Sequence, residues 1–122
     1  MRKLLIATAA VLASSTAVHA ETLKMATLPA NLMPAIVMAT FANIVSSNLD
    51  DIDIEVAAGG AATAHMMEVG RGNIEMSMSA PTVWALMKGG KAMYANQEEA
   101  PALADKVQLV MWYPYEIGRA HV

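Results

Sequence analysis

The sequence contains no cysteine, which excludes disulfides, thiolate metal sites and cysteine nucleophiles. Aromatic residues make up only 5% of the chain, with a single phenylalanine. The eight basic residues are scattered, so the sequence lacks the basic patch that nucleic-acid binding requires. We therefore expect no nucleic-acid partner and a core built from aliphatic and methionine side chains.

Long hydrophobic runs are also absent after the N-terminus, and the one at the start is too short to span a bilayer. Arg2 and Lys3 precede an uncharged apolar stretch, Leu4–Ala13, and Val18-His19-Ala20 then places compact residues at a cleavage position. This arrangement is typical of a secretory signal peptide. The sequence predicts a signal peptide at residues 1–20, cleavage after Ala20, and a mature protein in the periplasm.

The last seven residues, EIGRAHV at 116–122, have a different interpretation. They can be encoded by DNA that contains the start of a widely used short-read sequencing adapter, whose next codon in that frame is a stop. We interpret residues 116–122 as adapter read-through and residues 21–115 as part of a longer protein.

Periodicity in the mature part predicts alternating strands and helices. Alternating apolar and polar residues predict strands at Leu23–Thr27, Ile52–Ala57, Ile74–Ser79 and Val107–Tyr113. Apolar residues at helical spacing predict helices at Ala35–Asn48, Ala64–Gly70 and Thr82–Lys88, with one further helical turn inside the polar stretch Lys91–Asp105. This order with short connections predicts an α/β fold with a parallel or mixed sheet and helices on its faces.

Methionine is abundant, with eleven residues in the chain. Thioethers are soft ligands for Cu(I), so a periplasmic copper chaperone is one hypothesis. However, Met76 and Met78 alternate with polar residues in a predicted strand, and no M-x-x-M repeat occurs. The pattern favours methionine as a flexible core filler, and we expect no metal site.

Three loops connect a predicted strand to a predicted helix: Leu28–Met33, Ala58–Thr63 and Ser79–Thr82. Ligands of open α/β sheets bind at these carboxyl ends, where small residues let backbone N–H groups at helix starts approach an anion. Thr63 is also placed to cap the helix that Gly70 and Gly72 would end, so a plain tight turn with a threonine cap explains the second loop equally well.

Catalytic patterns are missing from the sequence. It has no G-x-S-x-G elbow and no P-loop, and His65 has no evident partner, which favours a structural histidine. The acidic stretch from Asp50 to Glu55 lacks the EF-hand pattern. We therefore predict a protein that is not an enzyme and uses no cofactor.

The order of elements resembles the N-terminal part of TAXI-type solute-binding proteins of tripartite ATP-independent periplasmic (TRAP) transporters, over nearly all of residues 21–115. A strand ending in Gly59-Gly60, a short helix, and then Gly70-x-x-Asn73-Ile74 carry the resemblance, where the family typically has Gly-x-x-Asp before an apolar strand. The chain departs from the family in Leu28–Pro34, which is often glycine-rich with a tyrosine, and after Gly60, where the family usually has serine and Glu-Asn.

The resemblance implies a periplasmic-binding-protein-like lobe of type II, the first of two lobes that close on a small organic anion, either an amino acid or a carboxylate. The closed protein would deliver this ligand to membrane permease subunits. The residues of this lobe that would donate or accept hydrogen bonds to the ligand are Asn31, Gly60, Ala61, Thr63, Ser79 and Thr82. Trp84 would form a wall of the site. The alternatives are the binding component of an ATP-driven importer and an exported enzyme whose catalytic residues lie elsewhere.

Overall fold

The computed structural model describes residues 20–113. The predicted adapter-derived residues 116–122 and the predicted signal peptide, apart from Ala20, lie outside this range. In chain order the elements are β1 (Glu21–Thr27), α1 (Met33–Asn48), β2 (Ile52–Ala58), α2 (Ala62–Arg71), β3 (Met76–Ser77), α3 (Pro81–Lys88), the 3-10 turn η1 (Ala92–Tyr94) and α4 (Ala100–Ala104). None of the helices between residues 20 and 113 combines the length and apolar content needed to cross a bilayer.

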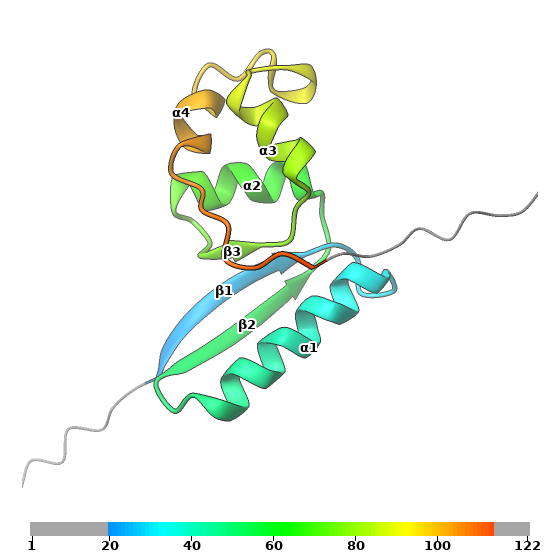
Figure 1. Cartoon of the computed structure of the whole chain (residues 1–122), viewed down its shortest axis with the longest axis vertical. Helices are drawn as coiled ribbons and strands as arrows, with labels where there is room; N and C mark the ends of the chain where they lie inside the picture. The colour runs from blue at the N-terminus through cyan, green and yellow to red at the C-terminus, as the bar shows by residue number, and fades with distance from the viewer. Residues whose placement is uncertain (1–19, 114–122) are drawn as a thin grey trace, which may run out of the picture.

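The three strands form one parallel sheet in the order β2-β1-β3, which confirms the predicted α/β class. β1 pairs with β2 along its whole length, from Glu21 opposite Ile52 to Thr27 opposite Ala58. Helix α1 covers one side of this ribbon, and α2, α3 and α4 gather beyond β3 (Figure 1). Each strand leads into a helix, as a parallel sheet requires.

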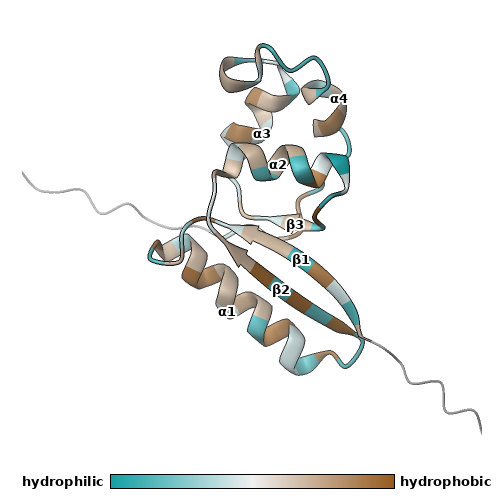
Figure 2. Cartoon of the chain, turned by 180° about the vertical axis from the view of Figure 1, so that it is seen from behind, coloured by the Kyte–Doolittle hydropathy of each residue, from teal (hydrophilic) through white to brown (hydrophobic). Residues whose placement is uncertain are grey.

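Apolar and polar residues alternate along β1 and β2, as the alternating colours of Figure 2 show. One face of the sheet is buried and the other is more exposed, and successive side chains point to opposite faces. In β2, Ile54 is buried whereas Asp53 and Glu55 are exposed. Helix α1 packs Met38 and Ala42 against this sheet. Pro34 lies in the first turn of α1, where a missing N–H costs no helical hydrogen bond.

A second hydrophobic cluster joins the three other helices. Its buried members are Met66, Met67, Met87, Tyr94, Ala100, Leu103 and Ala104. Gly70 of α2 allows α4 to approach, because a Cβ there would lie 2.8 Å from Leu103 Cβ and 3.0 Å from its carbonyl oxygen. Among residues 20–113, five of the buried side chains are methionines, which confirms their predicted use as core filler.

The predicted fourth strand at Val107–Tyr113 is wrong. Residues 107–113 form no strand and run past β3 without entering the described sheet (Figure 1). The physical reason lies in β3, which pairs with β1 through Met76 and Ser77 only, and therefore presents a very short edge. A nearly continuous apolar run also lacks the alternation that would choose one face of a sheet.

Smaller corrections concern α2 and β3. The N-cap of α2 is Ala61 and Thr63 lies inside the helix, so the predicted threonine cap is wrong. Gly70 is helical, so its predicted role in ending the helix is wrong, whereas Gly72, in the left-handed conformation at φ 78°, ends the helix as predicted. β3 is shorter than the predicted Ile74–Ser79, because Glu75 and Met78 only flank the ladder through single hydrogen bonds to β1 carbonyl groups.

Candidate functional site

The carboxyl ends of the three strands finish at one level. The Gly59 N–H donates to the Thr27 carbonyl at 3.1 Å, and the Met78 N–H donates to the Ala26 carbonyl at 3.1 Å. The three predicted loops therefore start side by side at one edge of the sheet. This level ending brings together loops that lie far apart in the sequence.

The strand order also places a topological switch point at this edge. From β1 the chain crosses to β2 on one side, and then returns past β1 to β3 on the other. Neighbouring loops consequently diverge between β1 and β3, which is the topological switch point where open α/β sheets bind ligands. The order β2-β1-β3 begins the doubly wound order seen in flavodoxin-like sheets.

The first loop joins β1 to α1 and contains Asn31, which is exposed. The Leu32 N–H donates to the Pro29 carbonyl at 3.0 Å, which shapes the loop as a tight turn. Thr27 precedes the loop and is fully buried, with its hydroxyl donating to the Leu28 carbonyl at 3.0 Å. Sequence reasoning did not select Thr27, although the last residue of a strand at this edge is a position that could have drawn attention.

The second loop contains Gly59 and Gly60, both at positive φ (127° and 78°). Ala61 then begins α2, and its carbonyl accepts the N–H groups of Ala64 and His65. A Cβ at Gly60 would lie 2.6 Å from His65 Nε2, so the imidazole lies directly against this turn. The His65 Nδ1 atom is buried and finds no hydrogen-bond partner within residues 20–113.

The third loop joins β3 to α3. Ser79 is half-buried, and its hydroxyl oxygen is buried without a hydrogen-bond partner among the described residues. Ala80 is the N-cap of α3, Pro81 lies in its first turn, and Thr82 is exposed there. A buried hydroxyl without a partner is uncommon in proteins and indicates a group that a water molecule or a ligand satisfies.

Thr63 and Trp84 are engaged by the helical cluster. The Thr63 carbonyl accepts a 2.8 Å hydrogen bond from the Tyr94 hydroxyl, which is buried under α2. The Trp84 indole N–H donates to the Ala104 carbonyl at 3.1 Å, which ties α3 to the end of α4. Tyr94 was missed by sequence reasoning because it lies in a polar stretch with no periodic signal.

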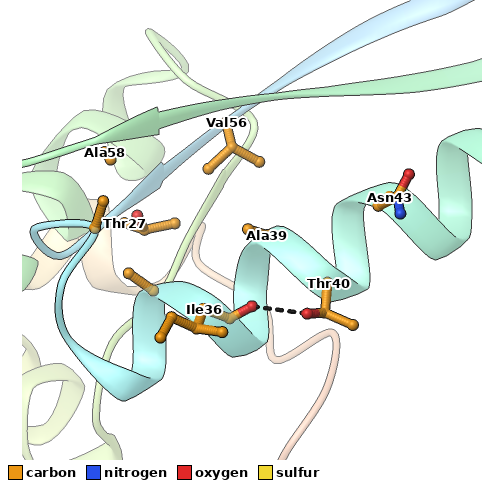
Figure 3. Close-up of a pocket in the computed structure, with 9 residues that line it drawn as sticks. Thr27, Ile36, Ala39, Thr40, Asn43, Val56 and Ala58 are labelled. Atoms are coloured by element: carbon orange, nitrogen blue, oxygen red, sulfur yellow. Dashed lines mark hydrogen bonds between the residues drawn. The ribbon is translucent and has the colours of Figure 1, made fainter.

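A hollow of about 370 Å³ lies between α1 and the ends of β1 and β2 (Figure 3). Thr27, Val56 and Ala58 line it from the strands, while Ala39 and Asn43 line it from the helix. The Thr40 hydroxyl donates back to the Ile36 carbonyl at 2.9 Å and is thus already paired. Small and apolar side chains dominate this hollow, so it offers little to bind a polar group.

Charge is absent from the three loops at positions 28–32, 59–61 and 78–80. Helix N-termini carry partial positive charge, and no carboxylate in these loops offsets it. Within residues 20–113, no group of three or more His, Asp or Glu side chains is placed to hold a metal ion. The pKa of Glu68 is lowered by hydrogen bonds from Asn73 and Arg71. These three residues lie at or just after the C-terminal end of α2, away from the loops.

The arrangement can therefore bind an uncharged or anionic group through backbone N–H groups and a serine hydroxyl, and it contains no evident nucleophile–base pair. Comparison with protein-family models, curated proteins and solved structures finds no match to the chain.

Proposed function

We propose that residues 21–115 are the first lobe of a type II periplasmic-binding-protein-like receptor, exported to the periplasm, that captures a small organic anion for a TRAP-type membrane permease. The observation that carries this proposal is the level edge, where three uncharged loops of small residues meet at a topological switch point. Such switch points are where open α/β sheets hold their ligands.

An anion suits this edge for two reasons. The helices α1, α2 and α3 all begin here, because each follows a strand of the parallel sheet, and their first turns favour negative charge. The unpartnered Ser79 hydroxyl adds a donor that a carboxylate oxygen satisfies. Neutral loops leave the site without repulsion.

A single lobe leaves this edge open to water, and a ligand clamped on one side binds weakly. We therefore propose that a second lobe closes over this edge. The binding component of an ATP-driven importer would use the same plan, and genes beside the locus that encode a permease or an ATPase distinguish the two transporters.

The test is calorimetry of the complete protein, including the proposed second lobe, with succinate and glutamate, each compared between wild type and Ser79→Ala. A hydrogen bond to a charged ligand contributes about 1.5–3 kcal/mol, so we expect affinity to fall by a factor on the order of ten to one hundred. Ser47→Ala, on the exposed side of α1, is the matched control and should bind as wild type does.

Equal affinity in Ser79→Ala and wild type would remove Ser79 from the site. Absence of any anion binding by the complete, folded protein would refute the proposed function. Turnover of a bound compound would instead establish the exported enzyme.

A further inference from the structure

A second cavity lies beside β3, where residues of α1, α2, the start of α3 and the segment 107–113 line it. Its volume is about 430 Å³, within the range of small-molecule sites. It reaches from the buried face of β1 to the start of α3, so it ends at the same edge as the three loops. Both Ser79 and Pro81 are among the residues that line it.

Methionine and aromatic side chains dominate the wall of this cavity. The methionines are Met25, Met38, Met66, Met76, Met78 and Met111. The aromatic residues are Phe41, Trp84, Trp112 and Tyr113. Methionine side chains are flexible and polarizable, and they make favourable contacts with aromatic rings, so such a wall adapts to an apolar ligand.

The polar side chains of the lining include Glu75, Ser77, Ser79 and Gln108, and only Glu75 carries a charge. Glu75, before β3, lines one end, and its carboxylate accepts the Lys24 backbone N–H at 2.7 Å. Ser79 and the start of α3 line the other end, where no carboxylate stands. An anionic head group is repelled from the Glu75 end and favoured at the Ser79 end.

We infer that the anion bound by this lobe has an apolar body, as in an aromatic or branched aliphatic carboxylate, which lies in the methionine-lined cavity with its carboxylate toward Ser79. This inference rests on the proposed function and names the class of its ligand. The apolar body displaces water from the methionine wall, while the carboxylate lies beside the Ser79 hydroxyl and the first turn of α3.

The chain supplies its own reporter for this test, because both of its tryptophans line the cavity. The complete protein is titrated with 3-phenylpropionate, propionate and glutamate, following tryptophan emission and the heat of binding. Burial of a phenyl group is worth a few kcal/mol, so 3-phenylpropionate should bind at least about tenfold more tightly than propionate and change the emission.

Two matched variants test the place of binding. Met111 lines the cavity at 40% exposure, and Met93 lies outside it at 49%, so both tolerate a polar replacement. Met111→Asp places a carboxylate in the apolar wall and should weaken 3-phenylpropionate by at least about tenfold, whereas Met93→Asp should leave its affinity unchanged.

Equal affinity for propionate and 3-phenylpropionate, or an unaffected Met111→Asp variant, overturns the inference. Binding of glutamate without binding of 3-phenylpropionate overturns the inference and leaves the proposed function intact. If the complete, folded protein with its second lobe binds none of the three anions, both are overturned.

Discussion

Among single residues, Gly60 has two separate requirements for glycine. Its φ of 78° lies in the left-handed region, and a Cβ would lie 2.6 Å from His65 Nε2. Gly72 shares the same φ, but a Cβ there would meet nothing within 4 Å. Comparing alanine variants at Gly60 and Gly72 therefore distinguishes the cost of backbone strain from the cost of steric contact.

We expect Gly72→Ala to lower the free energy of unfolding by about 1 kcal/mol through strain alone, and Gly60→Ala to lower it by roughly 1 kcal/mol more. Urea unfolding measures both values. In a double-mutant cycle, His65→Ala should remove the extra cost of Gly60→Ala. Equal costs for the two glycine variants would show that the His65 ring simply moves away.

Tyr94 is a buried phenol whose hydroxyl donates to the Thr63 carbonyl. Replacing Tyr94 with phenylalanine should lower the free energy of unfolding by about 1 kcal/mol, because the carbonyl loses its donor. Chemical unfolding at neutral pH measures this change. An unchanged stability would mean that water replaces the donor.

Tyr94 also predicts a dependence on pH. Burial raises the pKa of its phenol above the ordinary 10.0, so the folded state holds the proton more tightly than the unfolded chain does. This contribution to stability is complete below pH 10 and is lost as the pH rises through the raised pKa. Unfolding measured from pH 9 to 11 should show a steeper decline in wild type than in Tyr94→Phe, and equal slopes would contradict the assignment.

At the scale of elements, the contact between α2 and α4 depends on Gly70. Alanine there gains up to about 1 kcal/mol of helix propensity but places its Cβ 3.0 Å from the Leu103 carbonyl oxygen, which is backbone and cannot rotate away. We expect the clash to outweigh the gain, so that Gly70→Ala lowers stability and increases hydrogen exchange in α4 more than in β1. Higher stability than wild type would show that α4 shifts without cost.

The elements predicted from sequence are those with clear local signals. The long alternating strands β1 and β2, and the prolines that begin α1 and α3, gave correct element types with small errors in bounds. The predicted strand at 107–113 was wrong because a strand needs the edge of another strand as its partner. The local sequence gives no sign that β3 offers only two paired residues.

The positions of the three loops in the candidate site were also predictable, because they follow from the alternation of strands and helices. The parallel order β2-β1-β3 places the three predicted loops at one edge, as the alternation of strands and helices implied. The structure also ties Trp84 to α4, and it places the His65 ring against Gly60. These contacts join residues distant in the sequence or depend on side-chain direction, so periodicity and motif spacing contain no signal for them.

At the scale of the whole molecule, residues 109–112 present an unusual exposed apolar stretch. Leu109 is 79% and Val110 is 75% exposed. Replacing both with serine should leave the free energy of unfolding within about 0.5 kcal/mol of wild type, because neither side chain is buried. The same change should raise the concentration at which the chain associates, as light scattering measures, because contiguous exposed apolar surface promotes self-association. Unchanged association would place the cause elsewhere.

The level ends of β1 and β2, with Thr27 opposite Ala58, have a consequence for how such a sheet can diversify. The paired residues end at Thr27, Ala58 and Ser77, so residues of 28–32, 59–61 and 78–80 other than Gly60 can be exchanged while the strand register stays fixed. Selection, or a loop-grafting library, can therefore vary the surface of this edge without redesigning the framework beneath it.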